Sequence, residues 1–116
     1  MKPSVLFIVT SDPRVSHRPA EAIRIAAGVG AWQRVEPRVY LRDAAVLALE
    51  ESTDRLIDED HFRQYLPILV EAGQPIYAQE DAPGLPAAGA ASAKFEPISD
   101  SRLAALAAES RYVLRF

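Results

Sequence analysis

The chain has 116 residues, 25% of them charged, with a formal net charge of -3, and this length predicts one compact domain over residues 1–116 with its own hydrophobic core. The acidic balance supplies no basic surface for a phosphate backbone, so nucleic acid is not expected as a partner. The absence of cysteine excludes disulfides, thiolate metal ligands and thiol nucleophiles.

The amino-terminal segment shows no pattern of a targeting signal. Residues 1–4 lead directly into an apolar run of strand length, which is too short for the core of a signal peptide and is not followed by a cleavage site. No apolar stretch reaches the about 18 residues that a membrane-spanning helix needs. We therefore expect a soluble cytoplasmic protein that does not contact membranes.

The first predicted strand covers residues 5–10, a continuous apolar run rich in branched side chains. Such a run is typical of a strand that is covered on both faces, so we expect it inside a parallel sheet rather than at its edge. A helix follows, with an apolar face of mostly small side chains at Ile23, Ala26, Ala27 and Gly30. We interpret the last three as a close packing contact with the sheet rather than as a phosphate loop. The glycines at 28 and 30 are interpreted as the carboxyl-terminal stop of this helix.

A second strand is predicted over residues 38–41, followed by a short helix rich in alanine and leucine with Asp43 as its N-cap. The polar and acidic residues 52–60 predict a surface loop or a short helix. Helical spacing returns at Phe62, Tyr65, Leu66 and Leu69. Because Pro67 removes a backbone hydrogen bond, we expect either a kink there or a new helix over 67–73.

The last third of the chain begins with a third strand over residues 74–79. Residues 80–97, rich in proline, glycine and alanine, predict a long connection that serves as a lid, an interface segment or a disordered loop, and the alanines favour packing against a neighbour. Ser99 and Asp100 then cap a helix with an apolar stripe at Leu103, Leu106 and Ala107, and a strand follows over 111–116.

Repeated strand–helix units of this kind predict an α/β fold, a three-layer α/β/α sandwich around a mainly parallel five-stranded sheet. Four segments in order, VLFIVTSDP, PRVYLRDAAVLAL, EAGQPIYAQ and SDSRLAALAAESRYVLRF, resemble the DsrE/DsrF-like family of small sulfur-relay proteins. The resemblance spans nearly the whole chain. It implies a homo-oligomer, with a trimer or a multiple of it favoured, and a protein partner that handles sulfur.

The chain departs from this family in one chemical group. Family members that carry sulfur have a cysteine just after the third strand, where this sequence reads Tyr-Ala-Gln-Glu-Asp over residues 77–81. Persulfide transfer needs a thiolate, which hydroxyl and amide groups cannot replace. The sequence therefore excludes covalent sulfur carriage through cysteine and leaves the fold and a role in an assembly open.

Polar residues follow the first three strands and should share one edge of the sheet, where open α/β folds bind ligands. The candidate ligand-binding residues are Ser11, Asp12, Arg14, His17, Arg42, Asp43 and Gln79. Arg14, His17 and Arg18, next to backbone amides at a helix start, favour an anion. We favour the structural interpretation over ligand binding: Asp12 and Asp43 cap helices, the arginines are solvated or pair with acids, and His17 is polar turn surface.

Several established motifs are absent. The sequence has neither of the glycine-rich phosphate loops and no nucleophile elbow. Its two histidines, His17 and His61, lack partners at metal-ligand spacing, so we expect no metal, no cofactor and no catalytic residues.

Two function classes remain. The first is a non-catalytic, DsrE-like interaction subunit that forms a homo-oligomer and docks onto sulfur-handling partners. The second is a small-molecule or anion-binding protein, with acid–base chemistry at the strand ends as an option, which uses Asp12, His17, Asp43 and Gln79. An interaction subunit should bury apolar surface between protomers and have no enclosed polar pocket at the strand ends, whereas a binding protein should enclose a polar pocket there.

Overall fold

The computed structural model describes residues 2–116, so Met1 of the expected domain lies outside the described residues. All neighbouring strands of its five-stranded sheet pair in parallel, in the order β4-β3-β2-β1-β5. The predicted α/β class with a five-stranded parallel sheet is confirmed. The strands are β1 (Ser4–Val9), β2 (Glu36–Leu41), β3 (Ile76–Gln79), β4 (Glu96–Ile98) and β5 (Tyr112–Arg115).

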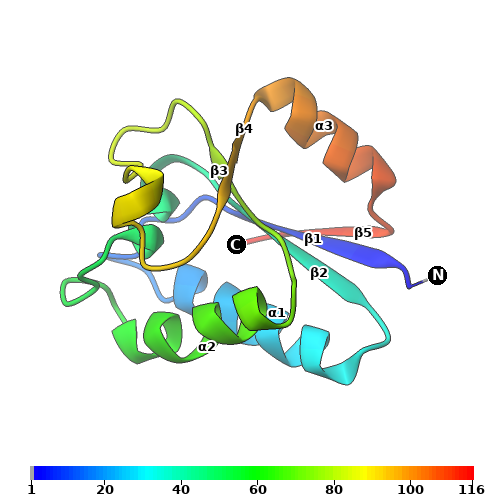
Figure 1. Cartoon of the computed structure of the whole chain (residues 1–116), viewed down its shortest axis with the longest axis horizontal. Helices are drawn as coiled ribbons and strands as arrows, with labels where there is room; N and C mark the ends of the chain where they lie inside the picture. The colour runs from blue at the N-terminus through cyan, green and yellow to red at the C-terminus, as the bar shows by residue number, and fades with distance from the viewer. Residues whose placement is uncertain (1) are drawn as a thin grey trace.

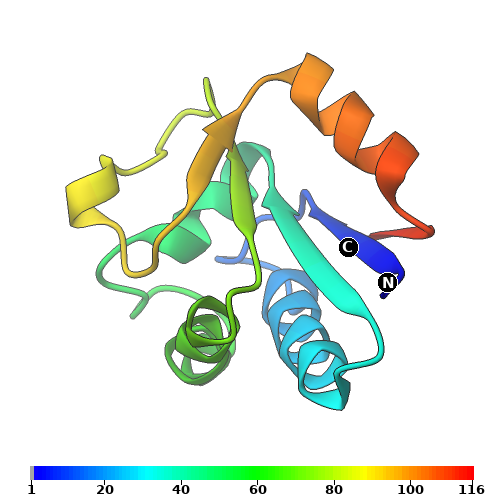
Figure 2. The ribbon, with the colours of Figure 1, turned by 45° about the vertical axis from the view of Figure 1, so that its right-hand side comes forward.

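Helices cover both faces of the sheet, but unevenly (Figures 1 and 2). One face packs against α1 (Arg18–Trp32) and α2 (Glu59–Glu71), and the other packs against α3 (Asp100–Glu109) alone. Two short 3₁₀ helices, η1 (Asp43–Leu49) and η2 (Ala88–Ala90), lie in the connections. Among the described residues, no helix has both the length and the apolar character that crossing a bilayer demands.

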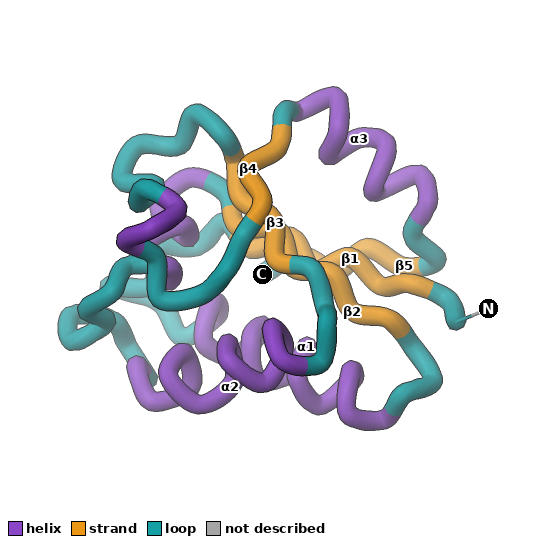
Figure 3. Tube along the Cα trace, viewed as in Figure 1, coloured by secondary structure: helices purple, strands orange, loops and turns teal. Residues whose placement is uncertain are grey.

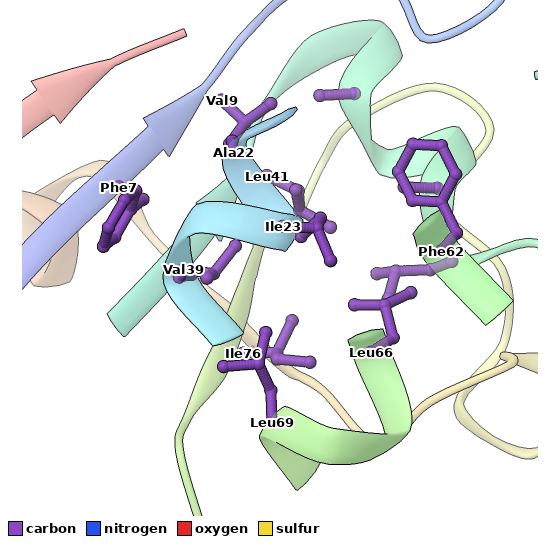
Figure 4. Packing of buried hydrophobic residues seen from close by; sticks show 14 of the residues in the cluster. Phe7, Val9, Ala22, Ile23, Val39, Leu41, Phe62, Leu66, Leu69 and Ile76 are labelled. Atoms are coloured by element: carbon purple, nitrogen blue, oxygen red, sulfur yellow. The ribbon is translucent and has the colours of Figure 1, made fainter. Parts of the chain in front are cut away.

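The first strand lies inside the sheet as predicted, between β2 and β5. Its side chains alternate between the two faces, and five of its six residues are buried. The larger core lies between the sheet and the α1/α2 layer (Figure 4), where the sticks drawn for β1, β2, α1 and α2 converge. The smaller core on the α3 side consists of Leu6, Tyr40, Tyr77, Ile98 and Leu106.

The predicted stop of the first helix at residues 28–30 is wrong, because α1 continues to Trp32. Its carboxyl-terminal cap is Gln33, with a φ of 63°, whose amide donates to the carbonyl of Gly30. The predicted packing role of Gly30 is confirmed: a Cβ atom there would lie 3.2 Å from the Cγ of Pro37 on β2. The glycine lets the helix approach the strand closely.

The predicted N-cap role of Asp43 is also wrong. Arg42 occupies the cap position of η1, and neither residue makes a side-chain capping hydrogen bond there. Asp43 is the first residue of the 3₁₀ helix and has a φ of 54°. The chain must turn sharply between β2 and η1, and aspartate is among the few non-glycine residues that tolerate this conformation.

A single helix, α2, spans the region where a kink or a new helix was expected at Pro67. Phe62, Leu66 and Leu69 are buried on its inner side, and Pro67 is exposed. The hydrogen bond that proline removes would be accepted by the carbonyl of Arg63, four residues earlier. Because both residues are exposed, water can hydrate that carbonyl while the apolar stripe holds the helix together.

The connection 80–97 contains structure that the sequence did not reveal (Figure 3). It includes η2 and most of β4, a three-residue edge strand that carries Pro97. Ser92 donates its amide to the carbonyl of Leu49 at 2.9 Å, and Ala82 is buried in the larger core. This connection therefore packs against its own chain, beside η1.

Candidate functional site

The predicted site residues all lie at or just after the carboxyl ends of β1, β2 or β3, as the parallel sheet requires. They do not form one site. Within the described chain they divide into four separate ion-paired or hydrogen-bonded groups and one residue, Ser11, held by its backbone.

Asp12 and Arg14 pair with each other in the turn after β1. The Asp12 carboxylate accepts from the Arg14 amide at 2.9 Å and from the guanidinium at 2.8 to 3.2 Å. The bond from Arg14 lowers the pKa of Asp12. A carboxylate that accepts an amide two residues ahead closes an Asx turn. Asp12 therefore shapes this turn. The expectation that it caps α1 is wrong, because the N-cap position is occupied by His17.

His17 contacts the start of α2 and not the Asp12–Arg14 pair. Its Nδ1 lies 2.8 Å from the Oδ2 of Asp58. The contact lowers the pKa of the Asp58 carboxyl. His17 occupies the N-cap position of α1 but makes no side-chain capping bond there. The pair thus connects the amino-terminal ends of two helices, and both side chains are well exposed.

Arg42 lies on the opposite side of the sheet, next to α3. Its Nη1 donates to Asp100 at 2.8 Å and to the hydroxyl of Tyr40 at 3.0 Å. The Arg42 bond lowers the pKa of Asp100, while burial raises the pKa of Tyr40. Arg42 therefore joins the end of β2 to the first turn of α3.

Asp43 and Gln79 meet between the ends of β2 and β3. The backbone amide of Asp43 donates to the Oε1 of Gln79 at 2.9 Å. Next to them lies an open hollow of about 480 Å³ lined by Arg14, Asp43, Ala44, Leu47, Pro83 and Gly84. Gly84 has a φ of 87°, and a Cβ there would lie 3.1 Å from a methyl group of Leu47. The loop after β3 thus closes tightly over η1.

The helix start behind the predicted anion site offers few free amides. The Arg18 amide donates to the hydroxyl of Ser16 at 3.1 Å, and Pro19 has no amide hydrogen. The Arg18 guanidinium donates to the carbonyl of Arg115 at 3.1 Å. Ser11 donates its amide to the carbonyl of Phe116 at 3.4 Å. These groups mainly tie the first turn to the end of β5.

Sequence reasoning missed the partners Asp58, Tyr40 and Asp100. Asp58 and Asp100 lie 41 and 58 positions from His17 and Arg42, so no local pattern indicates these pairs. Tyr40 lies two residues from Arg42, and the alternation along β2, which places both on one face, could have indicated their contact. Ser99 behaves as predicted, because its side chain accepts the amide of Arg102 and caps α3. No cluster of three or more metal-ligating side chains occurs within residues 2–116.

The edge therefore offers paired charges and one open hollow. Arg14 and Asp43 contribute the charged groups of that hollow, and the Arg14 guanidinium is already bonded to Asp12. An incoming anion would have to compete with this carboxylate. The arrangement can position loops and helix ends, and it presents no nucleophile paired with a base.

The fold is shared with a solved structure. The chain superposes on the crystal structure of the YchN protein from E. coli with a TM-score of 0.77, at 17% sequence identity and over 100% of both chains. This chain has a DsrE/YchN-like fold. No protein-family model matches the sequence, and no curated protein matches it either. At this level of identity the likeness concerns the fold alone.

Proposed function

We propose that this chain is a non-catalytic interaction subunit that assembles with copies of itself through the open edge of its sheet at β5. The observation that carries the proposal is the exposed apolar surface of this strand. Tyr112, Val113 and Leu114 are 60%, 39% and 42% exposed in the isolated chain. Three adjacent apolar side chains on an edge strand are unusual for a surface that faces only water.

The two edges of the sheet differ in how they are protected. At one edge, β4 is only three residues long and contains Pro97, which cannot donate a hydrogen bond to a further strand, next to the charged Glu96. Short edge strands, proline and charge are the usual means of preventing strand addition. At the other edge, β5 is one residue longer, has no proline, and carries its one charged residue, Arg115, at its end. The β5 edge is thus the one that can accept another strand.

The backbone of β5 has groups available for such pairing. Phe116 donates to Ile8 and accepts from Thr10, both at 2.9 Å, so its backbone groups face β1. Because backbone direction alternates along a strand, those of Val113 and Arg115 face outward. The carbonyl of Arg115 accepts one bond from Arg18 and retains a second lone pair.

A second copy of the same strand is a suitable partner. In an antiparallel pair with Leu114 on a two-fold axis, Leu114 faces its own copy, Val113 faces Arg115, and Tyr112 faces Phe116. This register joins apolar side chains at Leu114 and at the Tyr112–Phe116 pairs, sets Val113 beside Arg115, and places no like charges directly opposite each other. Two sheets would thereby continue into one.

The resemblance to DsrE/DsrF-like proteins favours a trimer or a multiple of it, and two-fold contacts at β5 are compatible with a pair of trimers. We propose that such an assembly docks onto a sulfur-handling protein. The paired charges at the carboxyl edge support this function over binding of a small molecule there, because Asp12, His17 and Arg42 already have partners.

The test is the mass in solution, measured by light scattering coupled to gel filtration at micromolar protein and physiological salt. We expect the mass of a trimer or a multiple of it rather than the 12.7 kDa of one chain. Leu114→Lys and Val113→Lys should each give a smaller species, because a lysine on an edge strand opposes strand addition.

Ile68→Lys is the matched control. Ile68 lies on α2, away from β5, and is exposed to the same 42% as Leu114. Its substitution should leave the mass unchanged. A monomeric wild-type protein would contradict the proposal and favour the small-molecule binder, and an equal loss of assembly in the Ile68 variant would remove β5 as the interface.

A second measurement tests the absence of covalent sulfur transfer. After mixing with a sulfur donor and a desulfurase and then desalting, the intact mass should show no added sulfur atom, because the chain has no cysteine thiol. A stable mass increase of one sulfur would contradict the non-catalytic proposal.

A further inference from the structure

A second charged cluster lies at the amino edge of the sheet, opposite the predicted site. There a pocket of about 540 Å³ opens beside the first residues of β1 and β2 and the end of α3. It is lined by Lys2, Pro3, Ser4, Glu36, Arg38, Glu109, Ser110 and Arg111. Pockets of this volume hold small organic ligands.

Arg38 is the unusual group in this pocket. It lies on β2, two residues before Tyr40 and therefore on the α3 side of the sheet, and its side chain is only 21% exposed. Its Nε is buried and has no hydrogen-bond partner in the described part of the chain. A buried guanidinium donor without an acceptor is costly, so its presence requires an explanation.

The neighbouring carboxylates balance the charge of Arg38 without satisfying its hydrogen bonds. Glu109 lies 3.5 Å from Nη1, and Glu36 lies 3.9 Å from Nε. At such separations the contacts are mainly ionic. The terminal nitrogens of Arg38 are not buried as Nε is, so an acceptor in the pocket that reaches them would add a charge-assisted hydrogen bond that the described chain does not supply.

The sign of the local charge favours an anion. The pocket lining contains three cations, Lys2, Arg38 and Arg111, and two carboxylates, which leaves one positive charge in a chain whose net charge is -3. The hydroxyl of Ser4 makes only a long contact of 3.5 Å, to the carbonyl of Glu109, and can turn toward a ligand.

We propose that this amino-edge pocket binds a small organic oxyanion, a carboxylate or a phosphate, which accepts hydrogen bonds from Arg38 and faces Arg111 and Lys2. A guanidinium presents parallel donors that match both groups. The site is separate from the carboxyl edge and does not depend on assembly through β5.

The experiment is a titration of the full chain, labelled with nitrogen-15, followed by NMR at the Arg38 Nε–H resonance. Inorganic phosphate and succinate are the two probes, and sodium chloride at equal ionic strength is the reference. We expect a saturable shift with at least one probe. The probe that saturates at the lower concentration identifies the ligand as a phosphate or a carboxylate.

Arg38→Gln should weaken binding by about tenfold or more, the loss expected for one charge-assisted hydrogen bond. Backbone amide shifts of the pocket residues report binding in this variant. Arg24→Gln removes the same charge from an exposed pair with Glu21 on α1 and should leave binding unchanged. If Arg38→Gln fails to fold, Arg111→Gln at the exposed rim should weaken binding in the same direction.

Shifts that merely follow ionic strength, as with chloride, would overturn the proposal. So would an absence of saturation with both probes, or an equal weakening by Arg24→Gln.

Discussion

At the scale of single residues, the carboxyl edge shows how polar side chains serve local geometry. Asp12 closes a turn, Ser99 caps α3, and Gln79 accepts the amide of Asp43. Asp43 is the most constrained of these residues because its φ is positive. Its conformation, rather than its carboxylate, is what the fold uses.

This constraint gives a prediction for two substitutions at one position. Asp43→Gly should leave the free energy of unfolding unchanged or raise it slightly, because glycine adopts a positive φ freely. Asp43→Val should lower it by about 1–2 kcal/mol, because a branched side chain is strained there. Urea unfolding of both variants is the measurement. Equal stability of the two would show that the backbone relaxes at this turn.

At the scale of elements, close packing of helix and strand decides where a glycine is required. Gly30 faces Pro37 at the α1–β2 contact, whereas a Cβ at Gly28 would meet nothing within 4 Å. Both glycines lie within the same helix, and they differ only in what surrounds them. Helix propensity therefore decides the effect of a substitution at Gly28, and packing against β2 decides it at Gly30.

The same substitution at both positions separates the two effects. Gly28→Leu should stabilise the protein by roughly 0.5–1 kcal/mol, because leucine is a far better helix former than glycine. Gly30→Leu should destabilise it by about 1–3 kcal/mol, because the added side chain overpacks the contact. Thermal unfolding followed by circular dichroism measures both. A stabilised Gly30 variant would mean that α1 can move away from β2 at little cost.

The contact between β2 and α3 predicts a pH dependence. Arg42 lowers the pKa of Asp100, so the ionised carboxylate stabilises the folded state above the unfolded-state pKa, near 3.9, and this contribution is lost as the pH falls through the lowered pKa. Asp100→Asn should therefore lower the melting temperature slightly at pH 7. At a pH below the lowered pKa of Asp100, where the carboxyl is protonated in both states, the substitution should make no difference.

The control for this measurement is Asp81→Asn, at an exposed position for which the described chain shows no ion pair. It should not change the melting temperature at either pH. A difference between Asp100→Asn and wild type that persists at the acid end would mean that the substitution acts through helix capping or packing and not through the ion pair.

At the scale of the whole molecule, the uneven coverage of the sheet leaves apolar surface at one edge. Two helices cover one face and a single helix covers the other (Figure 2). The edge strand β5 exposes Tyr112, Val113 and Leu114. This exposed apolar edge is the surface at which we propose that a second copy binds.

Association predicts that thermal stability depends on concentration. The melting temperature of the wild-type protein should rise with protein concentration, because the partner binds only the folded state. Leu114→Lys should abolish this dependence, and Ile68→Lys should retain it. Differential scanning calorimetry over a wide range of concentrations tests this, and a constant wild-type melting temperature would contradict assembly.

Local patterns in the sequence were sufficient for most elements. The apolar run at residues 5–10 predicted the interior strand, and the spacing of Phe62, Leu66 and Leu69 predicted the buried face of α2. These signals depend only on neighbours along the chain, since strands and helices repeat every two and 3.6 residues. The lack of cysteine, which excludes a thiol carrier, is likewise a property of the sequence itself.

The tertiary structure decided the features that depend on residues far apart in the chain. The strand β4 exists because β3 offers it a backbone to pair with, although its three residues carry no strand pattern of their own. His17 meets Asp58 and Arg42 meets Asp100 across 41 and 58 positions of sequence. Distances that only the folded chain defines decide which charged side chains pair with each other. They also leave the Nε of Arg38 without a hydrogen-bond partner among the described residues.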